Sequence, residues 1–322
     1  ATASGQVVCF SYLAAASLWN VERFPQVNHG AEVQRAETSI AADGPMVAAV
    51  LTALGVPALV VANGIGDDAP GDQVRAWLHR NRVMTTSETV LGLPTPQIVI
   101  VADDHGTRTW FPHLPGVAEA LAAVDLAPLA EASFAYIDCY QLIEPAAVRA
   151  IQAARQAGVP LLVNLGGSVL SPAVAAAVQG YPGLIIQTNV DDAEHESAPA
   201  AAGALVDQTG ASWAVVTAGV FGAVAAGPDD LVAMPAFDLQ IRHTHCAGAA
   251  FSGGVIYGLL HGRPMTETLL LATASGGLRC ERVHHGSLPG LEELRVFISE
   301  HRHGVGPGSR AGEHVPSQDF RE

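Results

Sequence analysis

The sequence predicts an α/β fold in which a central, mostly parallel β-sheet is flanked by helices. From residue 117 onward, apolar runs of strand length alternate with helix-forming segments, and the turns between them are short. This alternation is typical of a parallel sheet that is covered on both faces. Of the 322 residues, 49% are hydrophobic and only 15% are charged. We therefore expect a well-buried globular core, large enough for one large or two ordinary domains.

The N-terminal third is expected to hold the first strands and helices, each predicted from its local pattern. The first helix is ended by Gly55, a residue type that is common just past a helix C-terminus. The expected elements are a strand at 6–10, an irregular or β-rich stretch at 18–40, a helix at 45–54, a buried strand leading into a Gly/Asp loop over 57–68, a helix at about 71–81, and a hairpin of strands 97–101 and 107–111.

The remainder of the chain carries the alternating pattern and then two long helices. Strands are expected at 133–140, 160–167, 183–190 and 213–227, and helices at 144–158, 171–180, about 197–209, 250–261 and 266–280. Residues 303–322 are rich in Gly, Pro and charge, so we expect a flexible C-terminal tail. No repeat or linker divides the rest, which predicts a single α/β domain over 1–302.

Charge and composition exclude several function classes. The formal net charge is −15, which disfavours nucleic acid and acidic membranes as partners, and no apolar run reaches the roughly 18 residues needed to cross a bilayer. All 16 basic residues are Arg, so lysine-based Schiff-base chemistry and lysine-containing P-loops are excluded. The N-terminus has no basic leader, and four widely spaced cysteines show no CxxC pair. We expect reduced thiols in a cytoplasmic protein.

The stretch from His243 to Gly254, HTHCAGAAFSGG, is the most informative part of the chain. A turn of small residues at the start of an apolar helix leaves backbone N–H groups unpaired and pointing outward. The helix dipole adds partial positive charge at the same place, so this turn is predicted to bind an anion.

This stretch resembles the C-terminal signature of the ribokinase-like (PfkB) carbohydrate kinase family, D-T-T-G-A-G-D-A-F-x-G-G. His243 and His245 stand at the first Asp and the second Thr, Cys246 at the first Gly of G-A-G-D, and Ala249 at its Asp. Three further segments match the family in the same order: VAAVLTALGVPALVVANGIGDDAPG, TNVDD for the N-x-x-E motif, and VVTAGVFGAVA for the T-x-G-x-x-G nucleotide loop. In the family, the Asp at the position of Ala249 is the base that deprotonates the sugar hydroxyl.

The resemblance implies a ribokinase-like central sheet with a small β-sheet lid, here at about 12–40 and 94–113. It implies ATP and Mg²⁺ as cofactors, a small-molecule ligand as partner, and a homodimer formed through the lid. The implied nucleotide- or anion-binding residues are Asn189, Asp192, Thr217, Gly219, Gly222, Cys246, Ala247 and Gly248. The implied substrate pocket is formed by Tyr12, Ala14, Ala16, Asp43, Met46 and Trp110.

The ligand-contacting positions depart from the family pattern. Ala14 and Ala16 stand where ribokinase-like members have Asn and Asp, and the family's G-G-N-x-x-N reads Ala41-Ala42-Asp43-Gly44-Pro45-Met46. Sugar hydroxyls need side-chain donors and acceptors, which this pocket largely lacks. With Ala249 in place of the base, we predict that sugar-kinase chemistry is lost or repurposed, while the cleft still binds a nucleotide or another small molecule.

Two other function classes stay open. One is an active ATP-dependent carbohydrate or nucleoside kinase with a different base, for which His243 and His245 are weak candidates. The other is a scaffold or regulatory pseudokinase that binds a protein.

Three further hypotheses concern the chemistry of single groups. The thiol of Cys246, at a helix start, would have a lowered pKa and act as a nucleophile. His243, His245 and Cys246 would bind zinc together with His284 and His285. Magnesium would bind through water to carboxylates. These carboxylates are Asp67, Asp68, Asp191 and Asp192.

Overall fold

A computed structural model describes residues 5–104, 108–283 and 286–301 of the protein. The tip of the predicted hairpin, the pair His284 and His285, and the predicted tail over 303–322 lie outside these described residues. Among the described residues, no helix has the length and apolar character that crossing a membrane requires.

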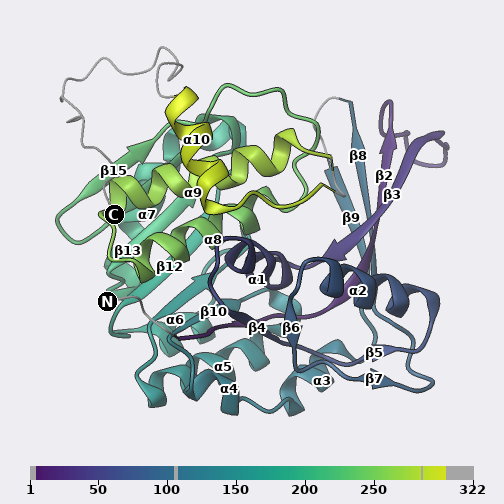
Figure 1. Ribbon diagram of the computed structural model, residues 1–322, viewed down its shortest axis with the longest axis horizontal. Helices are drawn as coiled ribbons and strands as arrows, with labels where there is room; N and C mark the ends of the chain where they lie inside the picture. The colour runs from purple at the N-terminus through teal and green to yellow at the C-terminus, as the bar shows by residue number, and fades with distance from the viewer. Residues whose placement is uncertain (1–4, 105–107, 284–285, 302–322) are drawn as a thin grey trace.

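The described chain forms a central nine-stranded sheet in the order β15-β14-β13-β12-β11-β10-β1-β4-β6 (Figure 1). From β6 to β13 every neighbouring pair is parallel, and β14 and β15 complete the sheet in antiparallel fashion. The strands are β1 (Val7–Phe10), β4 (Ala58–Val61), β6 (Met84–Thr85), β10 (Phe134–Asp138), β11 (Leu161–Asn164), β12 (Leu184–Asn189), β13 (Trp213–Thr217), β14 (Ala223–Ala226) and β15 (Leu231–Met234).

Helices cover both faces of this sheet. Alternate residues of β1 belong to different core clusters, since Val7 and Cys9 pack with one set of helices and Val8 and Phe10 with another. The first set is α1 (Asp43–Ala53), α2 (Ala69–Arg80), α8 (Ala247–Leu260), α9 (Met265–Glu281) and α10 (Leu291–His301). The second set is α3 (Val117–Ala123), α4 (Ala127–Ala130), α5 (Glu144–Ala157), α6 (Pro172–Val178) and α7 (Ala198–Thr209).

A second sheet, with the strand order β3-β2-β8-β9, stands beside the central one (Figure 1). Its strands are β2 (Ala14–Val21), β3 (Val33–Ala41), β8 (Gln97–Asp103) and β9 (Arg108–His113). Apart from Ala41, they fall within the two segments predicted as the lid. The side chain of Asn63 fixes the point where the chain leaves the central sheet, because it accepts a hydrogen bond from Leu13 N and donates one to Leu13 O. A third, two-stranded sheet pairs β5 (Ile65–Gly66) with β7 (Thr89–Val90).

The stretch 18–40, predicted as irregular or β-rich, is confirmed as β-rich, because it contains most of the hairpin of β2 and β3, whose register shifts between Asn20 and Val21. Other predictions about elements differ from the structure. The single strand predicted over 213–227 is the antiparallel pair β13 and β14, separated by the 3₁₀ turn η3 (Gly219–Phe221). Gly219 and Gly222 both have positive φ, which reverses the chain there. Helix α10 was not predicted.

Ala42 connects the second sheet to α1 in a conformation that normally requires glycine. It stands at the second glycine of the family's G-G-N-x-x-N and has φ 73° and ψ 160°. Residues other than glycine pay about 1 to 3 kcal/mol in this region. Position 42 therefore holds backbone strain immediately before Asp43.

We expect the substitution Ala42→Gly to raise the free energy of unfolding by about 1 kcal/mol, because the relief of strain exceeds the extra chain entropy of glycine. Urea denaturation of the two proteins measures the change. Ala153→Gly, in the interior of α5, is the matched control and should lose about 1 kcal/mol. A loss at position 42 similar to that of the control would contradict the assignment of strain.

Candidate functional site

A row of polar side chains crosses the carboxyl end of the central sheet. Asp138, Asn164 and Gln187 are register partners on neighbouring parallel strands, and Ser11 directly follows β1 on the other side of Asp138. All four side chains are buried. Ligands of open parallel sheets bind outside this edge, so the row lies where a site is expected.

The carboxylate of Asp138 has a full set of hydrogen-bond donors. Its Oδ2 accepts from Ser11 Oγ at 2.6 Å and from the Gly44 backbone N–H at 2.9 Å. Its Oδ1 accepts from the Tyr136 hydroxyl at 2.7 Å and from Asn164 Nδ2 at 3.2 Å. Complete burial, and next the charge of Asp43, raise the pKa of Asp138 to about 7. Asp138 therefore joins three strands to the start of α1.

Asp43 is the first residue of α1 and lies next to this network. Its Oδ2 accepts from Asn164 Nδ2 at 2.9 Å, and its backbone N–H donates to the Tyr140 hydroxyl at 3.2 Å. Burial raises the pKa of Asp43, while hydrogen bonds from Tyr140 and Asn164 and the charge of Arg108 oppose that rise. Asp43 is half-buried and does not cap its own helix.

The N-terminus of α8 lies beside that of α1. A Cβ on Gly253 of α8 would collide with Val50 of α1, so the two helices pack closely. Cys246 precedes α8 with φ 61°, a value that suits the glycine of the family signature, and no side chain caps the helix. The first turn carries no acidic residue, and Ala249 is completely buried.

Gln187 connects the polar row to α8. Its Nε2 donates to Ser252 Oγ at 2.8 Å, and Ser252 Oγ donates to the Gly248 carbonyl at 2.9 Å. This chain of hydrogen bonds fixes the first turn of α8 to the carboxyl end of β12.

The hypothesis of a reactive thiol at Cys246 stays a prediction, and the environment of the thiol argues against it. Burial raises the pKa of the Cys246 thiol to about 12, which is opposite to the lowering predicted for a thiol at a helix start. The neighbouring His245 contacts Cys246 Sγ through Nε2 at 3.3 Å, and the same nitrogen lies 3.2 Å from the Ile40 carbonyl. Burial lowers the pKa of His245 to about 3 and that of His243 to about 4. These imidazoles are weak proton acceptors at neutral pH.

The predicted substrate-pocket residues occupy different environments. Tyr12 is buried, and its ring meets that of Tyr140 edge-on with the centroids 5.8 Å apart. Ala14 and Ala16 are fully buried in the core cluster that contains Tyr12. Met46 is 2% exposed and packs in the apolar core around α1, so its side chain is part of the core.

Strand β9 of the second sheet brings a cation next to the residues before α8. Trp110, predicted in the pocket, is 57% exposed on β9, with the guanidinium of Arg108 5.9 Å from the centroid of its ring. Arg108 Nη1 donates to the Thr244 carbonyl at 3.3 Å and to the Thr244 hydroxyl at 3.1 Å, just before α8. The charge of Arg108 also acts on Asp43, His245 and Cys246. Sequence reasoning did not single out this residue.

The predicted nucleotide residues on β12 and β13 are brought together. Asn189 and Thr217 are register partners at the ends of their strands. Asp192 begins the 3₁₀ turn η2 (Asp192–Ser197), and a Cβ on Gly219 would displace its carboxylate. A side chain on Gly222 would collide with the Met234 carbonyl. The turn therefore requires glycine at position 222, and positive φ favours glycine at position 219.

The acidic residues proposed for metal binding differ in how many hydrogen bonds their carboxylates already accept within the protein. Both oxygens of Asp68 accept hydrogen bonds from Thr95 or from the start of α2 at Gly71, so this side chain is structural. Asp67 accepts from Gly92 N. Within residues 5–104, 108–283 and 286–301, no group of three or more His, Cys, Asp or Glu could hold a metal ion. The zinc hypothesis also needs His284 and His285, which lie outside the described residues.

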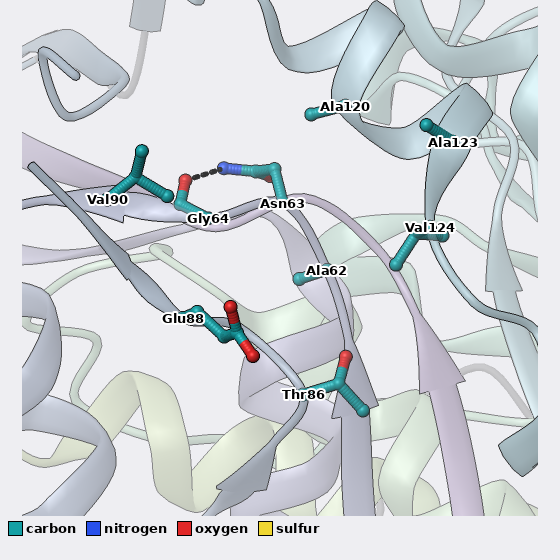
Figure 2. A pocket seen from close by; sticks show the side chains of 9 residues that line it. All are labelled: Ala62, Asn63, Gly64, Thr86, Glu88, Val90, Ala120, Ala123 and Val124. Atoms are coloured by element: carbon teal, nitrogen blue, oxygen red, sulfur yellow. Dashed lines mark hydrogen bonds between the residues drawn. The ribbon is translucent and has the colours of Figure 1, made fainter.

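A separate hollow of about 220 Å³ lies between the end of β4, the β6–β7 segment and α3 (Figure 2). Figure 2 shows small side chains such as Ala62, Ala120 and Ala123 in its wall, together with Asn63, whose amide donates to the Gly64 carbonyl at 2.9 Å. Glu88 is the one charged residue in its lining. None of the residues of the polar row lines this hollow.

A mostly parallel sheet with a small second sheet and glycine loops at its carboxyl edge defines a ribokinase-fold protein. The ribokinase of Arabidopsis thaliana, solved with ribose and ATP, shares 17% identity at a TM-score of 0.72, covering 91% of this chain and 98% of that one. The Thermotoga maritima ribokinase gives 15% identity, a TM-score of 0.71 and coverages of 92% and 99%. The Burkholderia thailandensis nucleoside kinase, solved with inosine, shares 18% identity at a TM-score of 0.70, covering 92% of this chain and 97% of that one.

Residues 6–289 match the pfkB family of carbohydrate kinases. The chain belongs to this family. Among curated proteins, none matches the chain. Because the sequence identities to the solved structures are low, the comparison with them establishes the fold alone. Any statement about the activity of this chain has to be argued from its own residues.

Proposed function

We propose that this protein binds a nucleotide, with Mg²⁺, and a small molecule in the cleft between the lid and the central sheet, and that it has lost ordinary sugar phosphorylation. The observation that carries the proposal is the first turn of α8. The position of the family's base is Ala249, which is fully buried, and no acidic residue lies in that turn. Loss of a general base removes about 10²- to 10⁴-fold in rate.

Neither histidine near α8 compensates for the missing base. The pKa of His245 is about 3 and that of His243 about 4, and the Cys246 thiol is protonated because its pKa is about 12. An efficient general base has a pKa near the working pH. By contrast, the pairing of Asn189 with Thr217 and the close approach of Asp192 to Gly219 support a nucleotide loop there.

The test measures binding and turnover separately. ATP and ADP at a hundred times their dissociation constants should stabilise the fold by about 2.7 kcal/mol, which raises the melting temperature by several degrees. Incubation with ATP, Mg²⁺ and ribose should transfer no phosphate above background. Phosphate transfer to ribose at an ordinary enzymatic rate would overturn the proposal.

Two glycine positions, one in the nucleotide loop and one in a helix away from it, provide a test variant and a control. Gly219→Ala should weaken stabilisation by ATP and ADP, since Gly219 has positive φ and a Cβ there would displace the carboxylate of Asp192. Gly203→Ala in α7 is the matched control, because a Cβ at Gly203 has open space around it, and its response to nucleotide should equal that of the parent protein. Equal stabilisation of both variants would place the nucleotide elsewhere.

The alternative of an active kinase with a different base is favoured by one observation. Asp43 is a carboxylate whose charge acts on Cys246 at the start of α8. If the protein did phosphorylate a sugar or nucleoside, Asp43→Asn should abolish that activity. A protein that responds to neither nucleotides nor small molecules would instead fit a scaffold or regulatory pseudokinase.

We also infer a cytoplasmic protein that dimerises through the lid. The four cysteines are free. Trp19 and Phe111 are 40% and 57% exposed on the lid sheet, which supports a covered surface there. Size-exclusion chromatography with light scattering should give a dimer for the parent protein and a monomer for the variant Phe111→Glu.

A further inference from the structure

Cys246, the residue just before α8, adopts a backbone conformation that a side chain disfavours. Its φ of 61° and ψ of 22° are left-handed, a conformation that glycine adopts readily and other residues rarely. No side chain caps α8, and the turn is closed by the Ala247 N–H, which donates to the Thr244 carbonyl at 3.3 Å. A strained backbone of this kind persists only where the surrounding structure holds it. The groups that hold it must therefore lie next to residues 244–246.

The second sheet contacts this turn from two of its strands. From β9, Arg108 Nη1 donates to the Thr244 carbonyl at 3.3 Å and to Thr244 Oγ1 at 3.1 Å. Near the end of β3, the Ile40 carbonyl lies 3.2 Å from His245 Nε2, and this nitrogen carries the proton because a carbonyl only accepts. The two residues that directly precede Cys246 are therefore both bound by the second sheet.

The backbone is strained on both sides of this contact. The described residues include four with positive φ that are not glycine, and two of them flank the contact. Ala42 lies two residues after Ile40, at the junction of β3 and α1, and Cys246 lies one residue after His245. Two unfavourable conformations at the ends of one contact indicate that the contact, and not either local sequence, determines the backbone there.

We propose that Arg108 is a positioning residue for anion binding at the start of α8. By binding Thr244 it holds Cys246 in the left-handed conformation, so the affinity of the turn for an anion depends on the position of the second sheet. The proposal rests on the proposed function, since the anion is a phosphate group of the nucleotide. Linkage then requires that a bound nucleotide tighten the contact between the second sheet and the turn by the same factor.

The first experiment measures the turn without a ligand, by amide hydrogen exchange followed by NMR on the full chain. Ala250 is buried and its N–H donates to the Cys246 carbonyl at 3.0 Å, so its exchange reports how firmly the turn is held. In Arg108→Gln this amide should exchange about tenfold faster or more, while that of Leu162 in β11 stays unchanged. The control is Arg23→Gln, an exposed charge on the loop between β2 and β3, with unchanged exchange at both amides.

The second experiment shows whether the effect passes through Cys246. Arg108→Gln should raise the dissociation constant of ATP with Mg²⁺, measured by titration calorimetry, by about tenfold or more. In a Cys246→Gly background the same substitution should raise it by less than about threefold, because glycine adopts positive φ without support. Arg108→Lys keeps a charged donor and should recover part of the lost affinity.

Two results would overturn the inference. One is unchanged exchange at Ala250 in Arg108→Gln. The other is an equal loss of ATP affinity with cysteine and with glycine at position 246, which would mean that the guanidinium binds the phosphate itself. If ATP binds and either result is found, the inference is wrong and the proposed function stands. If ATP does not bind the parent protein, the proposed function is wrong, whereas the exchange rates still show whether Arg108 holds the turn.

Discussion

Replacing Asp138 by alanine is expected to lower the free energy of unfolding by about 3 to 5 kcal/mol. The substitution removes the acceptor of four hydrogen bonds, from Ser11, Gly44, Tyr136 and Asn164, in a place that water does not reach. Donors that are left buried without a partner cost about 1 to 3 kcal/mol each, and loss of a buried charged partner costs about 3 to 5 kcal/mol. The variant no longer carries the cost of burying a carboxylate, so the net loss of stability is smaller than the sum of these separate costs.

Urea denaturation at pH 7 measures this loss, and Asp43→Ala is the matched control. Asp43 is the adjacent carboxylate, is less buried than Asp138, and accepts side-chain hydrogen bonds from Asn164 and Tyr140. Its removal should cost about 1 kcal/mol or less. A loss below 1 kcal/mol for Asp138→Ala, or equal losses for the two variants, would show that the network does not hold the site together.

Much of the fold follows from local sequence pattern. The short apolar runs that became β1, β10, β11 and β12 alternate with helices, and this pattern led to a parallel sheet. The family resemblance is confirmed by the match over 6–289. The hairpin of β13 and β14 was missed because its apolar pattern continues through the turn, and the reversal depends on two glycines with positive φ. Helix α10 was missed because its pattern is short and follows an irregular segment.

The candidate site was only partly predictable. The start of α8 and the glycine loop at 219–222 were identified from motifs, and their residues are close in space to their predicted partners. The polar row was not identified, although the sequence carries a visible signal: polar residues at or just after the carboxyl ends of the strands, such as Asn164 and Gln187. Which of these residues meet is decided by strand order and register, and a single sequence does not contain that information. Arg108 reaches Thr244 across 136 positions for the same reason.

The pKa values of the site predict two opposite pH dependences. The pKa of Asp138 is raised to about 7 in the folded protein, from an ordinary value of 3.8, so the folded state holds a proton that the unfolded chain releases. This contribution to stability is complete below about pH 4 and is lost as the pH rises through 7, amounting to about 2.5 kcal/mol between pH 5 and pH 8. The pKa of His245 is lowered to about 3 from 6.5, so the unfolded chain binds the extra proton. Its contribution is complete above pH 6.5 and about 2 kcal/mol of it is lost by pH 5.

Because these two contributions nearly cancel between pH 5 and 7, the stability of the parent protein alone cannot separate them, and differences between variants are the informative quantity. The free energy of unfolding of the parent minus that of Asp138→Asn should fall by about 2.5 kcal/mol from pH 5 to pH 8, since asparagine cannot titrate. The same difference for His245→Asn should rise by about 2 kcal/mol over that range. Hydrogen bonds lost in a variant change its free energy of unfolding by the same amount at every pH. They therefore shift each difference without changing its slope against pH. Guanidinium unfolding at six pH values tests both slopes, and a flat difference for Asp138→Asn would mean that this carboxyl is already ionised at pH 5 in the folded protein.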